Sequence, residues 1–348
     1  MASSTLTSSS SPFVPSDTLY IISTHAKCFD GAAAAAILEL YCTHKGYKHV
    51  NVPHILGKSF LREFGSYLQT GPVTLLMFDV SPDEELADVI LSKPQLHFVC
   101  GDHHVGNKPT LGRLMHARRS NISIMYDDNK CGAQLAWEWV QQSVKDMAKL
   151  SLVVDGVAEA ASSRTLSRLL DAICAFDLFV HKGNPELEAV EACLRLQHQP
   201  DTATLKAMLT TPGKYDEIVM EGALCARIMD NMAKDLLQRG RLYRLSRHAV
   251  TAVRMHGALI PEACSVFYVQ GTLHLSSEMG YLHSSADLVF IWSKNELAPK
   301  KYAVSVRRGR PSDIRCDIVV KALTQGRCTG HAAAAGMAFD TEPTFLLV

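Results

Sequence analysis

The sequence has no excess charge of either sign and no long hydrophobic run. Its 348 residues include 35 Lys and Arg and 35 Asp and Glu, which gives a formal net charge of zero. A protein that binds long nucleic acid through the phosphates needs a basic surface, so we expect a small substrate or a locally positive pocket instead. No stretch approaches the roughly 18 consecutive apolar residues of a membrane-spanning helix, and we expect no association with membranes.

The sequence also lacks paired cysteines and a targeting segment. Its ten cysteines are scattered without a CxxC pair. This excludes a disulfide scaffold or a zinc finger and predicts reduced thiols. The first 17 residues, MASSTLTSSSSPFVPSD, are rich in Ser and Thr and have neither the basic nor the apolar region of a signal peptide. We therefore expect a disordered leader over residues 1–17 and a cytoplasmic protein, with an organelle address left open.

Short apolar runs alternate with helical patterns in the first half of the chain. The expected strands are LYIIST (19–24), VTLLMFDV (73–80), LHFVCGD (96–102) and ISIMYDD (122–128). Helices are expected at 31–45, 57–68 and 83–93, with Pro82 at the first turn of the last, and in CGAQLAWEWVQQSVKDMAKL (131–150). Continuous apolar runs suit strands that are buried on both faces, so the alternation predicts a doubly wound, mainly parallel α/β sheet.

The second half of the chain has a different pattern. Residues from about 159 to 240 are mostly helical, and β-like runs return in AVTAVRMHG, SVFYVQG, DLVFIWS and YAVSVRRG. The run RGRLYRLSRH (239–248) is interpreted as a solvated linker. We expect an N-terminal α/β domain at 18–200, a helical connector at 201–244 and a smaller C-terminal α/β domain at 245–348. A cleft is expected between the two domains.

Small residues mark two helix starts. Gly31 is expected to permit a sharp turn after the first strand, and the five alanines that follow it to let the next helix pack tightly against the sheet. Cys131 heads the helix pattern after the fourth strand. Its small size is expected to let that helix approach the strand ends.

Polar residues follow three of the expected strands. They are His25 and Asp30 after the first strand, Asp79 after the second, and Asp102, His103 and His104 after the third. Any one of them could be a core histidine, a helix cap or a polar turn. Together they lie where ligands gather in open α/β sheets. Carboxylates with imidazoles suit Mn²⁺ or Mg²⁺, and two adjacent ions need a bridging carboxylate.

The order of these motifs resembles the DHH phosphoesterase superfamily. The motifs are H…CFDG, LLMFDV and CGDHHVG, with AFDLF similar to a fourth. The superfamily includes RecJ-type exonucleases, nanoRNases of the oligoribonuclease type, cyclic-dinucleotide phosphodiesterases and related pyrophosphatases and exopolyphosphatases. Near the C-terminus, VSVRRG and GRCTGHAAAAG (326–336) resemble signatures of the DHHA1 domain. The resemblance covers nearly the whole chain from about residue 18, and it implies a DHH catalytic domain followed by a DHHA1 domain.

The resemblance implies roles for individual residues. His25 would ligate one metal ion, Asp30, His103 and Asp177 the other, and Asp79 would bridge both. Asp102 and His104 would support the ligands or face the substrate, with His104 as the proton donor or phosphate contact. In the C-terminal domain, Arg307 and His331 would hold a phosphate or the base, and Gly326 and Gly330 would shape the loop.

Two departures from the family pattern bear on metal and substrate. Cys28 stands where many relatives have the first Asp of Asp-x-Asp-Gly. A thiolate is a soft ligand for Mn²⁺, so Cys28 is either a metal ligand for a weaker or different ion or a small buried thiol beside the site. Arg327, Cys328 and Thr329 replace glycines that precede the histidine in many relatives, which leaves the choice of substrate open.

We therefore expect a metal-dependent phosphoesterase. Two divalent ions, Mn²⁺ first and Mg²⁺ as the alternative, would activate a water that attacks phosphorus in a short nucleotide or oligonucleotide. No covalent nucleophile is needed. The alternatives are a hydrolase similar to exopolyphosphatases and pyrophosphatases, and a catalytically degenerate nucleotide-binding protein. A homodimer is compatible with the sequence.

Overall fold

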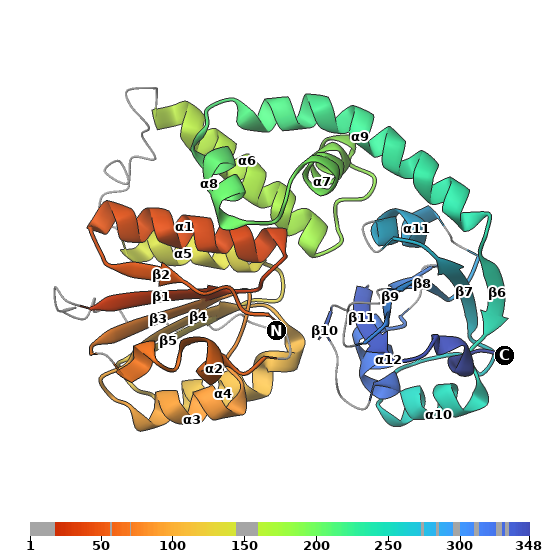
Figure 1. Cartoon of the computed structure of the whole chain (residues 1–348), viewed down its shortest axis with the longest axis horizontal. Helices are drawn as coiled ribbons and strands as arrows, with labels where there is room; N and C mark the ends of the chain where they lie inside the picture. Colours follow the sequence, from red (N-terminus) through yellow and green to blue (C-terminus); the bar gives the residue numbers. More distant parts are fainter. Residues whose placement is uncertain are drawn as a thin grey trace. The chain divides into compact units, whose positions relative to one another are not determined.

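The computed structural model describes residues 18–55, 58–69, 71–143, 159–272, 275–282, 285–294, 300–309, 313–324, 329–330 and 334–348. The chain forms two compact units. Unit 1 comprises Met1–Leu178 and His198–Glu217, and unit 2 comprises Phe179–Gln197 and Ile218–Val348. The chain therefore enters unit 2, returns to unit 1 and enters unit 2 again (Figure 1).

Unit 1 is built on a five-stranded sheet in which every strand pair is parallel, with the order β2-β1-β3-β4-β5. The strands are β1 (Leu19–Thr24), β2 (His49–Asn51), β3 (Val73–Phe78), β4 (His97–Asp102) and β5 (Ile122–Tyr126). The four strands expected from apolar runs are confirmed, with the second and fourth ending two residues earlier than expected. The short edge strand β2 was not expected, since its three residues carry no apolar run.

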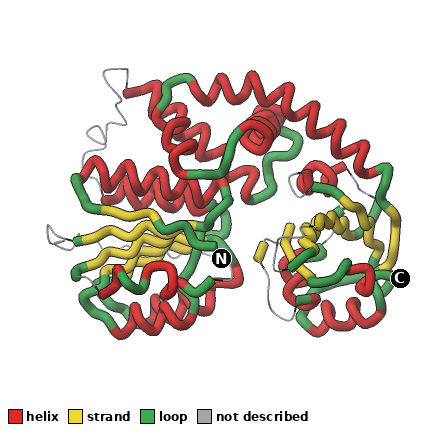
Figure 2. The backbone as a smooth tube through the Cα atoms, in the orientation of Figure 1, coloured by secondary structure: helices red, strands yellow, loops and turns green. Residues whose placement is uncertain are grey.

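Helices cover both faces of this sheet, as a doubly wound fold requires. Figures 1 and 2 show α1 and α5 on one face and α2, α3 and α4 on the other. The helices of unit 1 are α1 (Phe29–Lys45), α2 (Phe60–Phe64), α3 (Glu84–Ser92), α4 (Lys108–His116), α5 (Gly132–Ser143), α6 (Glu159–Asp177) and α8 (Thr202–Thr210), with the 3-10 helices η1 (Tyr67–Gln69) and η2 (Val105–Asn107).

Two expected helices differ from the prediction. The helix expected at 57–68 is only the five-residue α2, followed by η1 after a turn at Gly65. Helix α3 begins at Glu84, because the Asp83 side chain accepts a hydrogen bond from the backbone N–H of Leu86 and acts as the N-cap. Pro82 therefore precedes the helix and does not lie in its first turn.

The alanine run of α1 is buried on every side. Ala33, Ala34, Ala35 and Ala36 have no exposed surface, because α1 packs on the sheet beside α5 and is also in contact with α6 and α8. Side chains this small let two layers approach the same helix without loss of helix propensity. Gly31 has a different role from the one expected. It lies inside the first turn of α1, where a Cβ atom would be 2.2 Å from the carbonyl oxygen of His25.

Unit 2 contains a six-stranded mixed sheet with the order β10-β11-β9-β8-β7-β6. Only the pair β7–β8 is parallel among the strand pairs of this sheet in the described residues. Its strands are β6 (Arg241–Arg244), β7 (Ser265–Gln270), β8 (Leu288–Lys294), β9 (Tyr302–Arg308), β10 (Thr329–Gly330) and β11 (Ala334–Phe339). Its helices are α7 (Pro185–Gln197), α10 (Arg247–Met255), α11 (Ser276–Leu282), α12 (Cys316–Leu323) and η5 (Pro343–Leu346), and α9 (Lys214–Leu237) runs from unit 1 into unit 2.

Two interpretations of this region are wrong. The run AVTAVRMHG, expected to be a strand, forms most of α10. Ser246 caps this helix by accepting a hydrogen bond from the N–H of Ala249, and Val250 and Val253 are buried on one face while Arg254 is exposed. Residues 241–244, expected to lie in a solvated linker, form the edge strand β6, whose side chains are largely exposed.

Among the described residues, none of the helices combines the length and the apolar character that a membrane crossing would need.

Substituting Ser246 tests the capping of α10. Ser246→Ala leaves the N–H of Ala249 without its acceptor, and we expect the free energy of unfolding to fall by about 1 kcal/mol in urea denaturation followed by circular dichroism. Ser246→Asp keeps an acceptor at this position and is expected to match the parent protein. Equal loss in both variants would contradict the assignment of Ser246 as the cap.

Candidate metal centre

The carboxyl ends of three adjacent parallel strands bring the expected polar residues together. His25 follows β1, Asp79 follows β3, and His103 follows β4. Since β3 pairs with both β1 and β4, these three positions lie at one edge of the sheet. Asp30 enters from the first turn of α1, and Asp177 is the last residue of α6. The structure therefore brings these residues together at one edge of the sheet.

Asp79 adopts a backbone conformation that is rare for a residue with a side chain. Its φ is 58°, in the left-handed region, which costs a residue other than glycine about 1–3 kcal/mol and persists where the surroundings hold it. Its N–H donates to the carbonyl oxygen of Gly101 on β4, with an N···O distance of 3.0 Å. The neighbouring strand thus fixes Asp79 at the point where β3 ends.

Three carboxylates surround the ring of His103. Its Nε2 atom lies 3.2 Å from Asp79 Oδ1, 3.7 Å from Asp30 Oδ2 and 3.6 Å from Asp177 Oδ2. Asp30, His103 and Asp177 can each present one ligand atom within 4.8 Å of the others. The His103 side chain and the Asp30 and Asp79 side chains are almost completely buried.

A second group of possible ligands includes Asp79, which also forms a group with His103 and His104. His25, Cys28 and Asp79 can also present ligand atoms within 4.8 Å of one another, and His25 Nδ1 lies 3.8 Å from Asp79 Oδ2. The two oxygens of Asp79 therefore face different groups, Oδ1 toward His103 and Oδ2 toward His25. This is the arrangement that a carboxylate bridging two cations requires.

The charges of this cluster fit a cation. Among the described residues, Asp79 Oδ2 is buried without a hydrogen-bond partner, and no Lys or Arg pairs with Asp30 or Asp79. Burial and the neighbouring Asp30 carboxylate raise the pKa of Asp79 well above its usual value. Uncompensated buried carboxylates are costly, and a divalent ion would offset that cost. The donor set of carboxylate, imidazole and thiol is one that divalent metals accept.

The protonation of His25 and Cys28 differs. Burial and the nearby His104 lower the pKa of His25 to about 4, which keeps its ring neutral, the form that binds metal. Desolvation and the Asp79 carboxylate raise the pKa of the Cys28 thiol well above its usual value. Cys28 is therefore a ligand only where a cation displaces its proton. Both interpretations of Cys28, ligand and neighbouring thiol, remain compatible with its position.

The N-terminus of α5 holds Asp30 in place. The N–H groups of Gly132 and Ala133 donate to Asp30 Oδ2 and Oδ1 at 2.6 and 2.7 Å. Asp30 thus caps a helix distant in sequence from its own, and a carboxylate has further lone pairs for a metal. Gly132 is the small residue that allows this approach, because a Cβ atom on it would lie 2.4 Å from Asp79 Cβ. The prediction placed this role on Cys131, one residue earlier.

Asp102 organises the residues around it. Its Oδ1 accepts hydrogen bonds from the N–H groups of His103 and His104 at 2.7 and 3.0 Å and lies 2.7 Å from His104 Nδ1. Its Oδ2 accepts from Ser81 and from Asn107. Although burial acts to raise the pKa of Asp102, these hydrogen bonds, that of His104 first, lower it far below its usual value.

His104 is the partner of Asp102 that reaches the surface. Its side chain is 23% exposed, whereas that of Asp102 is fully buried. Burial acts to lower the pKa of His104, but the bond to Asp102 outweighs it and the pKa is raised. Ser81 and Asn107, which complete this network, were missed by the sequence reasoning. Their only signal is proximity in sequence to Asp79 and to the DHH triplet.

The C-terminal candidates lie in unit 2. Arg307, on β9, donates from Nη2 to Ser276 Oγ at 2.7 Å, and its guanidinium lies 4.7 Å from the ring centroid of Phe179. Phe179 has a φ of 58°, rare for an aromatic residue. Neither Phe179 nor Ser276 was expected as a support of Arg307. Gly330 is in β10, and Gly326 and His331 lie outside the described residues.

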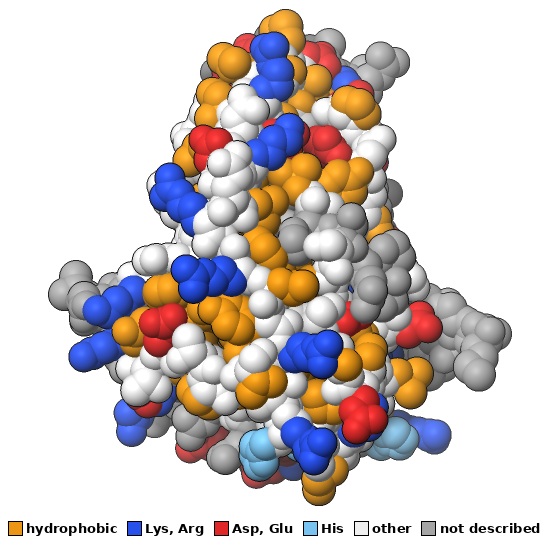
Figure 3. All heavy atoms as spheres, turned by 90° about the vertical axis from the view of Figure 1, so that its right-hand side faces the viewer, with side chains coloured by type: hydrophobic (Ala, Val, Ile, Leu, Met, Phe, Trp, Pro, Cys, Tyr) orange, Lys and Arg blue, Asp and Glu red, His pale blue; other side chains and the backbone are white. Residues whose placement is uncertain are grey.

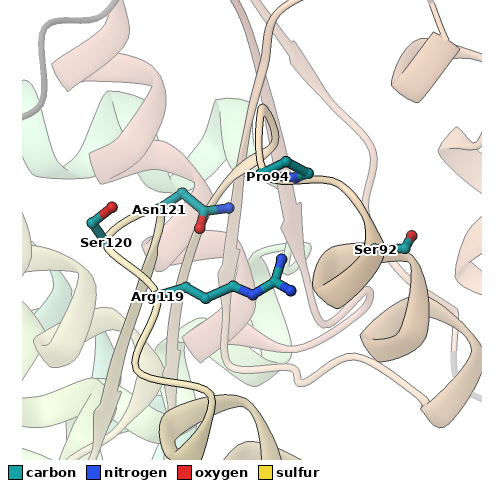
Figure 4. A pocket seen from close by; sticks show the side chains of 5 residues that line it. All are labelled: Ser92, Pro94, Arg119, Ser120 and Asn121. Atoms are coloured by element: carbon teal, nitrogen blue, oxygen red, sulfur yellow. The ribbon is translucent and has the colours of Figure 1, made fainter.

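A surface pocket lies away from this cluster. Figure 4 shows it lined by Ser92, Pro94, Arg119, Ser120 and Asn121. Pro94 precedes β4 and Asn121 precedes β5, so the pocket is at the amino ends of these strands. The candidate metal centre is at their carboxyl ends.

Comparisons with known proteins find similarity in fold but not in sequence. No model of a protein family matches the chain, and no curated protein matches it in sequence. The fold is similar to that of an exopolyphosphatase-related protein from Bacteroides fragilis, with a TM-score of 0.50, 10% identity and coverage of 95% of this chain and 89% of that one. RecJ from Thermus thermophilus in complex with Mn²⁺ gives a TM-score of 0.48 at 14% identity, covering 92% of this chain and 49% of RecJ, about half its length. A pGpG-specific phosphodiesterase, PggH, from Vibrio cholerae gives 0.35 at 13% identity, covering 92% and 93%. The chain thus has a mixed α/β fold similar to that of the exopolyphosphatase-related protein.

A substitution at Gly132 tests the packing that shapes the centre. Gly132→Ala places a methyl group against Asp79 and should displace the N-terminus of α5 from Asp30. We expect a melting temperature below that of the parent protein and an affinity for Mn²⁺ about 10- to 100-fold lower in isothermal titration calorimetry. Gly112→Ala is the matched control, because a Cβ atom there meets nothing within 4 Å. Parental stability and Mn²⁺ affinity in Gly132→Ala would contradict this packing role.

Proposed function

We propose that this protein is a metal-dependent phosphoesterase that hydrolyses phosphate ester bonds of short nucleotides, of the oligoribonucleotide or bisphosphonucleotide type. The observation that supports it most strongly is Asp79, whose two buried oxygens face two separate groups of possible ligands. A site for a single structural ion needs no such shared carboxylate. The order of the sequence motifs supports the same proposal.

The ligands are assigned from the two groups. His25 and Cys28 would hold one ion, and Asp30, His103 and Asp177 the other, with Asp79 shared. Mn²⁺ is the proposed ion and Mg²⁺ the alternative, because the set is rich in carboxylate and imidazole. Bound ions would lower the pKa of a shared water and neutralise charge on the phosphoryl oxygens. Asp30 and Asp79 would hold the ions at fixed positions, because hydrogen bonds to the backbone of α5 and of β4 fix these two residues.

His104 is proposed as the group that meets the substrate. Asp102 holds its ring by Nδ1, and the raised pKa of His104 favours the protonated form. A protonated imidazole can donate to a phosphate oxygen or to the leaving group. Asp102, held in turn by Ser81 and Asn107, is the residue that orients it. This division of roles leaves the proton on His104 and the negative charge on Asp102.

Arg307 is proposed to bind a phosphate of the substrate. Its planar guanidinium suits phosphate oxygens, and Ser276 and Phe179 limit the orientations available to it. Gly326, Gly330 and His331 are proposed to bind the substrate together with Arg307, as the motif resemblance implies. A small nucleotide substrate is consistent with the zero net charge of the chain.

A hydrolase for polyphosphate or pyrophosphate is the second candidate. It is favoured by one departure from the motif pattern, since Arg327, Cys328 and Thr329 replace glycines near the expected nucleotide-binding loop. A substrate screen separates the two. Purified protein would be assayed with Mn²⁺, with Mg²⁺ and without metal, against a chromogenic phosphodiester, short oligoribonucleotides, a 3′,5′-bisphosphonucleotide, cyclic dinucleotides and polyphosphate. We expect Mn²⁺-dependent turnover of the short nucleotides. Bound metal without turnover of any substrate would favour a nucleotide-binding protein and contradict the proposal.

Removing the shared carboxylate tests the metal assignment. Asp79→Asn is expected to lower turnover by more than the 10- to 100-fold typical of residues that only orient ligands, because both ions lose a ligand. The metal content, measured by inductively coupled plasma mass spectrometry, should fall as well. Asp83→Asn is the matched control: it keeps the cap of α3 four residues away and should retain parental turnover. Near-normal turnover in Asp79→Asn would refute the shared-ligand assignment.

The neighbouring arginines of β9 test the substrate contact. Arg307→Ala should lower kcat/KM for a short nucleotide by about 10- to 100-fold, the loss expected for a charge-assisted hydrogen bond, while the metal content stays at the parental level. Arg308→Ala, at the exposed adjacent position, should have little effect. Equal losses in the two variants would show that general positive charge, not a specific contact of Arg307, supports binding.

A further inference from the structure

Buried polar side chains carry more information about function than exposed apolar ones. Figure 3 shows hydrophobic side chains among Lys and Arg on one face of the molecule, as is normal for protein surfaces. A buried imidazole is less common, because a polar group leaves water at a cost unless it finds a partner. His54, which follows the edge strand β2, is only 3% exposed, and the proposed ligand sets do not use it.

Helix α2 holds the His54 side chain by its edge and by its face. His54 Nδ1 lies 2.6 Å from Glu63 Oε2, and the Glu63 side chain is 14% exposed. The His54 ring stacks on Phe60, with 3.7 Å between the ring centroids and 18° between the ring planes. Phe60 and Phe64 are in turn buried in the core of unit 1. The His54 ring is therefore fixed to a helix that is itself anchored.

The backbone of His54 holds the chain immediately before and after His25. Its N–H donates to the carbonyl oxygen of Thr24 at 2.8 Å, and its carbonyl oxygen accepts from the N–H of Ala26 at 2.9 Å. His54 and His25 form a parallel β-bridge beyond the ends of β1 and β2. These bonds extend the strand pairing to the residue that presents its imidazole to the candidate metal centre.

The position of the His25 ring depends on its backbone. His25 Nδ1 is 3.8 Å from Asp79 Oδ2, too far for a hydrogen bond, and the His25 side chain is 26% exposed. The backbone, in contrast, is closely held. A Cβ atom on Gly31 of α1 would lie 2.2 Å from the His25 carbonyl oxygen, and the bonds of His54 hold the same segment from the edge strand. A shift of His54 would therefore move His25.

We propose that His54 is a positioning residue for His25, and that the Glu63 carboxylate acts through it on the ion that His25 would bind. This inference rests on the proposed function, because it takes His25 as a metal ligand. Carboxylates commonly orient a ligating imidazole by bonding to its second nitrogen. Here the carboxylate orients a neighbouring histidine, whose backbone bonds pass the constraint on. The other candidate ligands of this ion are Cys28 and the shared Asp79, so a displaced His25 would leave it weakly held.

Variants of Glu63 test this role by isothermal titration calorimetry with Mn²⁺. The parent protein is expected to bind its two ions in two steps. Glu63→Leu leaves His54 Nδ1 without its acceptor, and we expect one step to weaken by about 10- to 100-fold while the other keeps its affinity. Glu63→Gln keeps an acceptor and should retain the parental affinity. Glu85→Leu, at an exposed position of α3, is the matched control and should match the parent protein in both steps.

A double variant shows whether the effect passes through His25. His25→Ala should weaken the same binding step. Adding Glu63→Leu to it should cause no further loss, because the effects of residues that act through one another do not add. Thermal unfolding followed by circular dichroism would show that each variant is folded. Glu63→Asp, whose carboxylate is shorter by one methylene, replaces Glu63→Leu if the latter does not fold.

The outcomes distinguish this inference from the proposed function. Parental Mn²⁺ affinity in the folded Glu63 variant, equal weakening of both steps, or losses that add in the double variant would overturn the role of His54 and leave His25 as a ligand. A loss in Glu63→Gln equal to that in Glu63→Leu would also overturn it, because the charge of Glu63 would then explain the effect. Parental affinity in His25→Ala would refute the ligand assignment itself, and with it both proposals.

Discussion

The structure of unit 1 depends on how it accommodates two buried carboxylates, those of Asp30 and Asp79, at the carboxyl ends of its parallel strands. Asp30 and Asp79 are almost fully buried, and the described residues place no Lys or Arg against either of them. The N–H groups at the start of α5 stabilise Asp30, but one oxygen of Asp79 has no such partner among the described residues. Such an arrangement is costly without a cation, and the fold concentrates that cost at one place. A divalent cation bound between these carboxylates would offset that cost.

The small residues of unit 1 follow from the same requirement. Gly31 allows the first turn of α1 to touch the backbone of His25, and Gly132 allows α5 to touch Asp79. The alanines of α1 then let two layers of structure close over the strand ends. A Cβ atom at either glycine would lie less than 3 Å from its neighbour, so the backbone would have to move away. The glycines and alanines are therefore part of the site although they offer no ligand atom.

Much of unit 1 could be predicted because its signals are local. The strands β1 and β4 contain the short apolar runs LYII and FVC, and polar residues at the strand ends could be placed on one edge from topology alone. The failures came from contacts between distant residues. Nothing in the sequence near Asp30 indicates that it caps α5, and nothing near Arg307 indicates Phe179 or Ser276. The run AVTAVRMHG was predicted to be a strand because its β-branched residues favour strands. It forms a helix in which Ser246 is the N-cap and the apolar residues are buried on one face.

The double passage of the chain through unit 2 has a consequence for its synthesis. The segment Phe179–Gln197 belongs to unit 2, and Ala192 on α7 packs in a core whose strands β7 and β8 follow some 75 to 100 residues later. Contacts of such separation form slowly, and the N-terminal part of a chain leaves the ribosome first. While the chain is being made, Ala192 on α7 therefore lacks its partners on β7 and β8 until those strands have been synthesised, although α9 follows sooner. A fragment beginning at β7 would lack part of its own core.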